Sequence, residues 1–316
     1  MKAWHFTGTH QPFTQVELDK PVAGPGQVLI KMKAAGLCHS DVGILEDPKW
    51  MELMKVPAIP GHEIAGVVDA VGDSDTGYSV GDRVAVWPLG NKGDTYGYAR
   101  PGGWGEYVVA DKEDIIAIPD EVPFDMAAAA TDAGMTSYGA MMETGGLQPG
   151  ERVGVIGFGG LGQIGARVAH LSGGELYVAE VNEAVWDAAY AAGAKKVVKD
   201  ITELKDVGLT LIVDYAGFGT TTAGAIETLA PNGRLVQVGM GRLEATLNMY
   251  PLITKRLKLL GNNGGSRDAI ANVMKFMASG DLKPAVEHTD FAGIPAGIQR
   301  LHDGGVRGRL VAMYED

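Results

Sequence analysis

The sequence has little cysteine, a deficit of positive charge and no long apolar run, and each shortage argues against a class of protein. One cysteine among 316 residues cannot form an internal disulfide, which argues against a stapled secreted scaffold. Aspartate and glutamate total 39 against 27 lysines and arginines, and the formal net charge of −12 would repel nucleic acid and anionic lipid. No apolar run reaches the roughly 18 residues of a membrane helix. We therefore expect no nucleic acid partner and no membrane partner.

The rest of the composition is that of a globular protein, with 46% hydrophobic and 21% charged residues. At roughly 100–200 residues per domain, the length predicts about two domains. Residues 1–6 lack the apolar core of a signal peptide, so we expect a cytoplasmic protein.

Strands and helices are distributed differently in the two halves of the chain. Up to about residue 119, short strands separated by glycine-rich turns predict a compact β-rich domain. From about residue 152, strands alternate with helical stretches, which predicts a parallel, doubly wound sheet of the α/β class. The predicted strands are 27–33, 64–71, 83–87, 105–109, 153–156, 176–179, 196–198, 209–214, 233–238, 258–260 and 309–313. The predicted helices are 124–143 (interrupted at Gly134 and Gly139), 161–171, one ending near 192, and 268–278.

A glycine-rich loop in the second half matches the pattern G-x-G-x-x-G. A predicted strand precedes it and a predicted helix follows it, and this context distinguishes a dinucleotide-binding loop from an ordinary glycine-rich turn. Gly157 permits the tight turn, Gly159 lets the backbone approach a pyrophosphate, and Gly162 lets the helix pack on the strand. The helix N-terminus then faces the anion. The predicted cofactor contacts here are Gly157, Phe158, Gly159, Gly160, Leu161 and Gly162.

An acidic residue, Glu180, ends the next predicted strand, about 20 residues beyond the glycines as the pattern requires. Its carboxylate can accept hydrogen bonds from the adenosine ribose, and its charge would repel a 2′-phosphate. The sequence therefore favours NAD over NADP. Asn182 and Lys195 lie nearby and leave NADP as the less favoured alternative.

A second group of residues in the first half of the chain has the chemistry of a metal site. The only cysteine, Cys38, stands beside His39 and near Asp41, and a second histidine, His62, follows downstream beside Glu63. Thiolate and imidazole are good Zn²⁺ ligands, and a catalytic zinc takes three protein ligands and keeps one open position. By spacing alone, a buried cysteine with unrelated histidines is an equally good interpretation.

Five segments, in order along the chain, resemble the zinc-dependent alcohol dehydrogenases of the medium-chain dehydrogenase/reductase family. They are Gly-Leu-Cys-His-Ser-Asp at 36–41, Gly-His-Glu-Ile-Ala-Gly at 61–66, Gly-Asp-Arg-Val at 81–84, the loop at 157–162, and Val-Arg-Gly-Arg at 306–309. The resemblance implies a GroES-like catalytic domain from residues 1–133 and 263–316. It also implies a Rossmann NAD-binding domain from residues 134–262.

The resemblance also implies the ligands of one catalytic zinc, namely Cys38 and His62. The third family ligand is usually a cysteine, and Asp132 stands at that position here. A carboxylate replaces a thiolate charge for charge, and Zn²⁺ accepts aspartate oxygen. The alternative is that Asp132 is an ordinary polar helix residue and the zinc is weak or absent. Under either interpretation of Asp132, Glu63 is an alternate zinc ligand or a residue that contacts the ligands.

Around the ligands, the resemblance assigns three roles to the residues after Cys38. Ser40 receives the substrate proton, Asp41 orients the imidazole of His62, and His39 meets the cofactor pyrophosphate. Relatives can pass the proton on through a histidine, but the corresponding position here is Gly43. The proton could therefore leave through the cofactor ribose or through His39.

Three further expectations follow from the resemblance. Arg309 contacts the pyrophosphate, and the stretch Val238, Gly239 and Met240 holds the nicotinamide carboxamide. Trp50 and Trp87 are candidate walls of the substrate pocket. A structural zinc is not expected, because relatives bind it with four cysteines and none lies between Trp87 and Gly105.

The expected activity is reversible hydride transfer between NAD and a small-molecule alcohol or ketone, which would be secondary, aromatic or of medium chain length. One alternative is a zinc-free enone or quinone reductase of the same superfamily that uses NADPH. Another, from a different class, is a non-catalytic nucleotide-binding sensor. The strand at 258–260 pairs across a dimer axis in relatives, so we also expect a homodimer or homotetramer.

Overall fold

The computed structural model describes residues 1–73 and 75–315, and the chain divides into two compact units. Unit 1 comprises Met1–Asp132 and the chain from Ile270 onward, and unit 2 comprises Ala133–Ala269. The sequence predicts one domain boundary between residues 133 and 134 and another between residues 262 and 263. The structure divides the chain for the second time between residues 269 and 270, which lie within the helix α8 (Arg267–Ala278).

Unit 1 is built on a seven-stranded sheet. Along the sheet the order is β14-β15-β3-β4-β5-β7, and β6 pairs with β3. All pairs are antiparallel except β14 with β15. The strands are β3 (Gln27–Leu37), β4 (Glu63–Val71), β5 (Arg83–Val86), β6 (Tyr107–Asp111), β7 (Ile115–Ala117), β14 (Val286–Asp290) and β15 (Arg309–Met313), and a separate hairpin joins β1 (Lys2–His5) to β2 (Thr14–Glu17).

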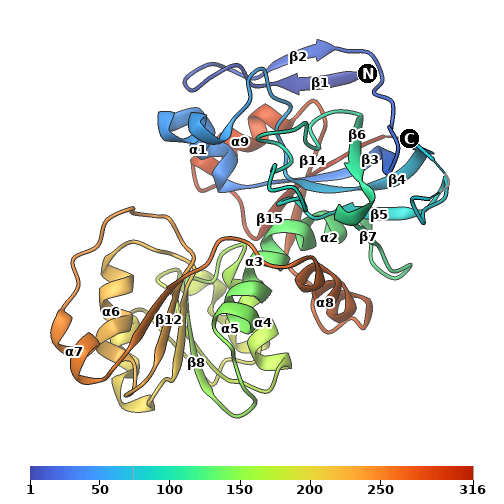
Figure 1. Ribbon diagram of the computed structural model, residues 1–316. Helices are drawn as coiled ribbons and strands as arrows, with labels where there is room; N and C mark the ends of the chain where they lie inside the picture. The colour runs from blue at the N-terminus through green and yellow to red at the C-terminus, as the bar shows by residue number, and fades with distance from the viewer. Residues whose placement is uncertain (74, 316) are drawn as a thin grey trace. The chain divides into compact units, whose positions relative to one another are not determined.

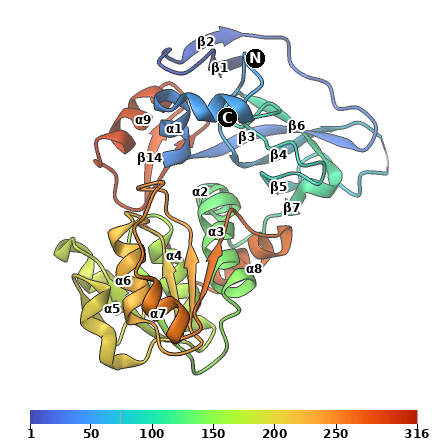
Figure 2. The same cartoon turned by 60° about the vertical axis from the view of Figure 1, so that its left-hand side comes forward.

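Short helices surround this sheet. The helix α1 (His39–Glu46) packs beside α9 (Ile294–His302), as both views show (Figures 1 and 2). The helix α2 (Phe124–Ala129) packs against β3, β4 and β15. The remaining helical segments of unit 1 are the 3₁₀ turns η1 (Pro48–Leu53) and η2 (Lys112–Asp114) and the π-helical turn η3 (Ala130–Gly134), whose last two residues belong to unit 2.

Unit 2 is the doubly wound α/β domain that the sequence predicted. Its six strands are all parallel, in the order β10-β9-β8-β11-β12-β13, and helices such as α4 and α6 flank the sheet (Figure 1). The strands are β8 (Arg152–Ile156), β9 (Glu175–Ala179), β10 (Lys196–Val198), β11 (Leu211–Asp214), β12 (Arg234–Gln237) and β13 (Lys258–Gly261). The helical segments are α3 (Met135–Tyr138), η4 (Gly139–Thr144), α4 (Gly162–Leu171), η5 (Glu183–Val185), α5 (Trp186–Ala191), η6 (Ile201–Val207), α6 (Thr220–Thr228) and α7 (Met249–Thr254).

One local feature agrees with the expected pattern and one differs from it. The predicted helix 124–143 changes between α-helical and π-helical turns at the two glycines expected to interrupt it, with Gly134 ending η3 and Gly139 beginning η4. The helix α1 stands where only strands and turns were expected. It begins because the Asp41 carboxylate accepts the backbone N–H of Cys38 at 2.8 Å, which caps the first turn.

No helix in the described part of the chain combines the length and apolar character that a bilayer crossing requires.

Candidate metal centre

Three separate parts of unit 1 supply the metal-binding side chains. Cys38 lies between the end of β3 and the start of α1, and His62 directly precedes β4. These positions are close because β3 and β4 pair in antiparallel register, with Gly36 opposite Glu63. Asp132 lies in the π-helical turn η3, a distortion that is frequent at functional sites.

The four candidate ligands converge. One donor atom from each of Cys38, His62, Glu63 and Asp132 lies within 4.8 Å of the others. The Asp132 Oδ2 atom is 3.4 Å from Cys38 Sγ and 3.5 Å from His62 Nε2. Tetrahedral zinc with its usual bond lengths separates such atoms by about 3.3–3.6 Å. The donor set of sulfur, nitrogen and oxygen therefore fits a zinc ion.

Arg309, the first residue of β15, provides positive charge beside the carboxylates. Its Nε donates to Glu63 Oε2 at 3.0 Å, and its Nη2 contacts the other Glu63 oxygen and lies 3.0 Å from Asp132 Oδ2. Glu63 is fully buried and Arg309 is 4% exposed. With Cys38 as a thiolate, the negative charges of Cys38, Glu63 and Asp132 equal the positive charge of one zinc ion and the Arg309 guanidinium.

The electrostatics of the site favour a thiolate and a positive charge. Burial raises the pKa of the Cys38 thiol, but the positive charges of Arg309 and His62 outweigh burial and lower it. Burial lowers the pKa of His62, but its neighbours Tyr98 and Asp41 outweigh burial and hold that pKa well above the usual value. The raised pKa of His62 reflects its acidic neighbours, and the lowered pKa of Cys38 favours the thiolate, the form of cysteine that binds metals.

The residues after Cys38 lie close to the ligands, apart from His39. Asp41 is 1% exposed, and its Oδ1 lies 3.5 Å from Nδ1 of His62, on the ring edge opposite Asp132. Burial raises the pKa of the Tyr98 phenol, and the neighbouring side chain of Ser40 lowers it in part. His39 is the first residue of α1 and is solvent-exposed.

An aromatic stack borders the metal ligands. The ring of Tyr98 lies 5.6 Å from the imidazole of His62, and Trp50 stacks on Tyr98 at 6.1 Å and 26°. A Cβ atom on Gly43 would lie 2.8 Å from the indole of Trp50. The indole therefore occupies the space that a side chain at position 43 would need.

In unit 2, the glycine loop has the backbone geometry that a dinucleotide loop requires. Gly157 has φ +84°, and a Cβ on Gly162 would lie 1.8 Å from the carbonyl oxygen of Gly157, so only glycine fits at the start of α4. A Cβ on Gly159 would meet nothing within 4 Å, which leaves the loop open on that side.

Glu180 is joined to this loop by a hydrogen bond. Its Oε2 accepts the backbone N–H of Phe158 at 2.7 Å, and its Oε1 accepts that of Asn182 at the same distance. At the end of β12, the N–H groups of Val238 and Gly239 both donate to the carbonyl of Asp214, and Met240 is 62% exposed.

Sequence reasoning missed two residues of the metal centre's surroundings. Tyr98 stands in an irregular segment where no pattern marks it, and only tertiary contacts bring it to His62. Arg309 was expected at the pyrophosphate, and its contacts with Glu63 and Asp132 were not foreseen. Trp87 directly follows β5, and its backbone N–H donates to the carbonyl of Asp114 at 2.7 Å.

Comparisons with known proteins agree with this fold. The alcohol dehydrogenase GroES-like domain matches residues 24–120, and the zinc-binding dehydrogenase domain matches residues 160–279. The chain is 30% identical to an alcohol dehydrogenase of Geobacillus stearothermophilus, covering 98% of this chain and 99% of the relative. It is 27% identical to the NADP-dependent alcohol dehydrogenase C 1 of Mycolicibacterium smegmatis, covering 98% and 97%.

Among solved structures, the acetophenone reductase from Geotrichum candidum in complex with NAD has a TM-score of 0.89 at 28% identity, covering 99% of this chain and 96% of that one. Fold and site together define an oxidoreductase enzyme. The chain belongs to the zinc-dependent alcohol dehydrogenases of the medium-chain dehydrogenase/reductase family, which confirms the resemblance in its sequence.

Proposed function

We propose that this protein oxidises an alcohol, and reduces the corresponding ketone or aldehyde, by hydride exchange with NAD at a single catalytic zinc. The observation that carries the proposal is the convergence of Cys38, His62 and Asp132, with Glu63 beside them, within 4.8 Å. When bound, zinc would supply Lewis acidity and the nicotinamide would accept or donate the hydride.

The protein's own residues hold and orient the reacting groups. Cys38, His62 and Asp132 bind the zinc, and Glu63 stays paired with Arg309 as a neighbour or alternate ligand. Asp41 orients His62 through Nδ1, which leaves Nε2 for the metal. The relatives' structural zinc has no cysteine ligands here, so one zinc per chain is proposed.

Ser40 takes up the hydroxyl proton of the substrate. The phenol of Tyr98 lies beside this side chain. Position 43 takes no part in the onward proton route, because it is glycine and the Trp50 indole lies against it. The route therefore runs through the cofactor ribose or His39.

For the cofactor, the glycine loop 157–162 binds the pyrophosphate. The expectation that Arg309 contacts the pyrophosphate is not proposed, because Arg309 is 4% exposed and is paired with Glu63 and Asp132. Glu180 binds the ribose diol and disfavours a 2′-phosphate, which supports NAD even though the mycobacterial relative is NADP-dependent. Val238, Gly239 and Met240 hold the carboxamide.

The proposed substrates are secondary, aromatic or medium-chain alcohols and the corresponding carbonyl compounds. Trp50 and Tyr98 place an aromatic surface beside His62, and such a surface suits a flat or apolar substrate. The name of the fungal relative, acetophenone reductase, points to the same chemistry. Trp87 remains a candidate pocket wall.

We also propose a cytoplasmic location and a homo-oligomer. The one cysteine would serve as a metal ligand, and a thiolate ligand requires a reducing compartment. The strand β13 lies at the edge of its sheet with Leu259 44% exposed, and the preceding helix α7 carries the exposed side chains of Tyr250 and Ile253, at 74% and 66%. A second copy would cover both.

The test combines metal analysis with activity. The purified protein should contain about one zinc per chain and oxidise alcohols from a panel with NAD. Cys38→Ser and Asp132→Ala should each lose the zinc and the turnover, because each removes one of three ligands. Both variants should still bind NADH, measured by its fluorescence, since the glycine loop lies in unit 2.

The outcomes separate the proposal from its alternatives. Alcohol oxidation that survives in both variants would contradict the metal mechanism. Enone or quinone reduction with NADPH in zinc-free protein would favour the zinc-free reductase. Bound zinc and cofactor without turnover of any alcohol or carbonyl compound would favour the sensor.

A further inference from the structure

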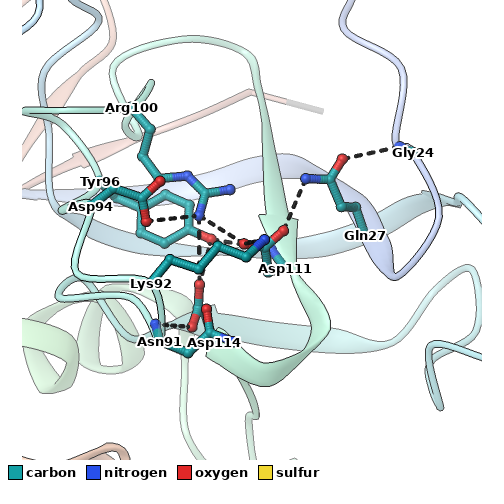
Figure 3. A network of polar contacts seen from close by, with 9 residues as sticks. All are labelled: Gly24, Gln27, Asn91, Lys92, Asp94, Tyr96, Arg100, Asp111 and Asp114. Atoms are coloured by element: carbon teal, nitrogen blue, oxygen red, sulfur yellow. Dashed lines mark hydrogen bonds and ion pairs between the residues drawn. The ribbon is translucent and has the colours of Figure 1, made fainter.

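An ionic cluster lies near the metal centre, with Arg100 at its middle. Figure 3 shows the guanidinium between three carboxylates, and its Nη1 atom is 3.0 Å from Asp111, 3.6 Å from Asp94 and 3.7 Å from Asp114. Asp114 is fully buried and the side chain of Asp111 is 4% exposed. Removing Arg100 would take the cation away from the buried Asp114, and it would leave Asp111 with Lys92, whose Nζ lies 2.8 Å away, as a counter-charge.

Tyr96 links this cluster to the backbone. Its hydroxyl donates to Asp114 Oδ2 at 2.9 Å and accepts the backbone N–H of Asp111 at 3.1 Å (Figure 3). The Arg100 guanidinium lies over the Tyr96 ring, 4.2 Å from its centroid. Residues 96 and 100 are thus both fixed to β6 and η2, and these contacts hold the two ends of the short turn between them.

The same turn carries Tyr98, which points to the metal centre. Tyr98 is 8% exposed, and it contacts the ring of His62, the ring of Trp50 and the side chain of Ser40. One face of the metal centre therefore depends on where residues 96–100 lie.

The residues that follow the turn support the backbone before His62. A Cβ on Gly102 would lie 2.2 Å from the carbonyl oxygen of Gly61, so the two backbones are in direct contact. The hydrogen bonds between these segments are Gly102 N–H to Ile59 O at 2.7 Å, Gly103 N–H to Gly61 O at 2.6 Å and Trp104 N–H to Pro60 O at 3.0 Å.

Packing alone does not hold this turn. A cavity of about 360 Å³ borders Tyr98 and Arg100 and continues along Lys55 and Pro57–Ile59. Side chains with a cavity on one side lack packing contacts there and can shift into it. Backbone hydrogen bonds also hold the turn, among them those from Tyr98 and Arg100 to the carbonyl of Thr95 and from Lys55 to the carbonyl of Tyr98. The polar contacts of Arg100 add the link from this turn to β6 and η2.

We propose that Arg100 is a positioning residue for the metal centre. By anchoring the turn 96–100 to Asp111 and Asp114, it holds Tyr98 against His62 and Ser40 and holds the segment 102–104 against Gly61. The inference rests on the proposed function, because it requires His62 to be a zinc ligand. The cluster stands in the stretch where relatives have four zinc-binding cysteines, and here it supplies the local order by ionic contacts.

The test compares Arg100→Met with Arg83→Met. Arg83 is a matched control in unit 1, since its guanidinium, like that of Arg100, lies over an aromatic ring, here that of Phe124. Its hydrogen bonds go to backbone carbonyls within residues 119–122 and not to the carboxylates around Arg100. Zinc affinity is measured by competition with a chromophoric chelator, and the ligand field by the visible spectrum of the Co²⁺-substituted protein. Both are recorded below the thermal midpoint of each variant.

Arg100→Met should weaken zinc binding about 10-fold and shift the Co²⁺ spectrum, as loss of a residue that orients a ligand does. Arg83→Met should leave both as in the wild type. Arg100→Lys, which keeps the charge but loses the planar fork, should fall between. If Arg100 acts through Tyr98, adding Arg100→Met to Tyr98→Ala should cause little further loss.

Three results would overturn the inference. Arg100→Met could bind Zn²⁺ with wild-type affinity and spectrum, Arg83→Met could weaken binding equally, or the two effects at Arg100 and Tyr98 could simply add. Should Arg100→Met not fold, the Arg100→Lys result decides, with a wild-type affinity and spectrum counting against the inference. A wild-type protein without any bound zinc would instead overturn the proposed function first.

Discussion

At Asp132, a carboxylate stands where the family usually has a cysteine thiolate. Its Oδ2 atom is close enough to Cys38 Sγ and His62 Nε2 for the three atoms to share one metal ion, and it also lies 3.0 Å from Nη2 of Arg309. An oxygen ligand that shares its charge with a guanidinium donates less to the metal than sulfur does. We therefore expect a more Lewis-acidic zinc than a second thiolate would give.

We expect Glu180 to select NAD over NADP, and a charge change there gives the first prediction. Glu180→Gln keeps the side-chain length but removes the charge that repels a 2′-phosphate. The ratio of kcat/KM for NADP to that for NAD should rise about 10-fold or more, because one charge contact is worth 1–3 kcal/mol. Glu183→Gln, an exposed residue on the adjacent turn η5, should leave the ratio unchanged. An unchanged ratio in Glu180→Gln would mean that the ribose is recognised elsewhere.

At the scale of elements, two glycines at the start of α4 are expected to have different roles, Gly162 in folding and Gly159 in cofactor binding. Gly162→Ala puts a methyl group into the carbonyl of Gly157, so it should destabilise unit 2 by several kcal/mol, measured by urea unfolding. Gly159→Ala places its methyl group in open space and should leave stability unchanged within about 1 kcal/mol.

The same pair predicts different binding. Gly159→Ala should weaken NADH binding about 10-fold, since the methyl group would stand between the backbone and the pyrophosphate. Wild-type NADH affinity in Gly159→Ala would show that the cofactor does not approach this side of the loop.

The segment from β6 to η2 gives a prediction about acid stability. Burial raises the pKa of Asp111, but hydrogen bonds from Lys92, Gln27 and Arg100 outweigh it and lower that pKa to about 2. A carboxyl group whose folded pKa lies below its unfolded value of 3.8 stabilises the fold above about pH 4. That contribution is lost as the pH falls toward 2, and it should amount to 1–2 kcal/mol, roughly.

Urea unfolding between pH 6 and about 2.5, with chelator present so that metal loss does not contribute, measures this effect. Asp111→Asn should be less stable than the wild type at pH 6, and the difference should shrink toward pH 2.5. Burial raises the pKa of Asp114, so Asp114 acts in the opposite direction and reduces the observed slope. A difference that is constant with pH would contradict the assigned role of Asp111.

At the scale of the whole molecule, the exposed edge of unit 2 predicts self-association. Leu259 on β13 is 44% exposed and Ile253 on α7 is 66% exposed, and an apolar edge strand without a cover promotes pairing with another chain. The double variant Ile253→Lys and Leu259→Lys should convert an oligomer to a monomer in light scattering. Val22→Lys, at an 87% exposed position of unit 1, should not change the mass. A monomeric wild type would contradict the proposed oligomer.

Much of the fold could be predicted from the sequence because local patterns specify it. Strand–helix alternation predicted the parallel sheet of unit 2, and the glycines at 157, 159 and 162 predicted the loop before α4. Glycines 134 and 139 predicted the interruptions of the helix 124–143, but not their π-helical geometry, because π-helical turns depend on the packing of neighbouring segments.

The sequence by itself determined the chemistry that the protein can perform, since residue types fix donor atoms, charge and backbone freedom. It named Cys38, His62 and Asp132. Only the tertiary structure decided which side chains surround them, because Tyr98, Arg100 and the Arg309 contacts come from strands and turns far apart in the chain. Such contacts leave no local pattern: a buried cation or a stacked ring is placed by the pairing of whole elements, and that pairing is a property of the folded molecule.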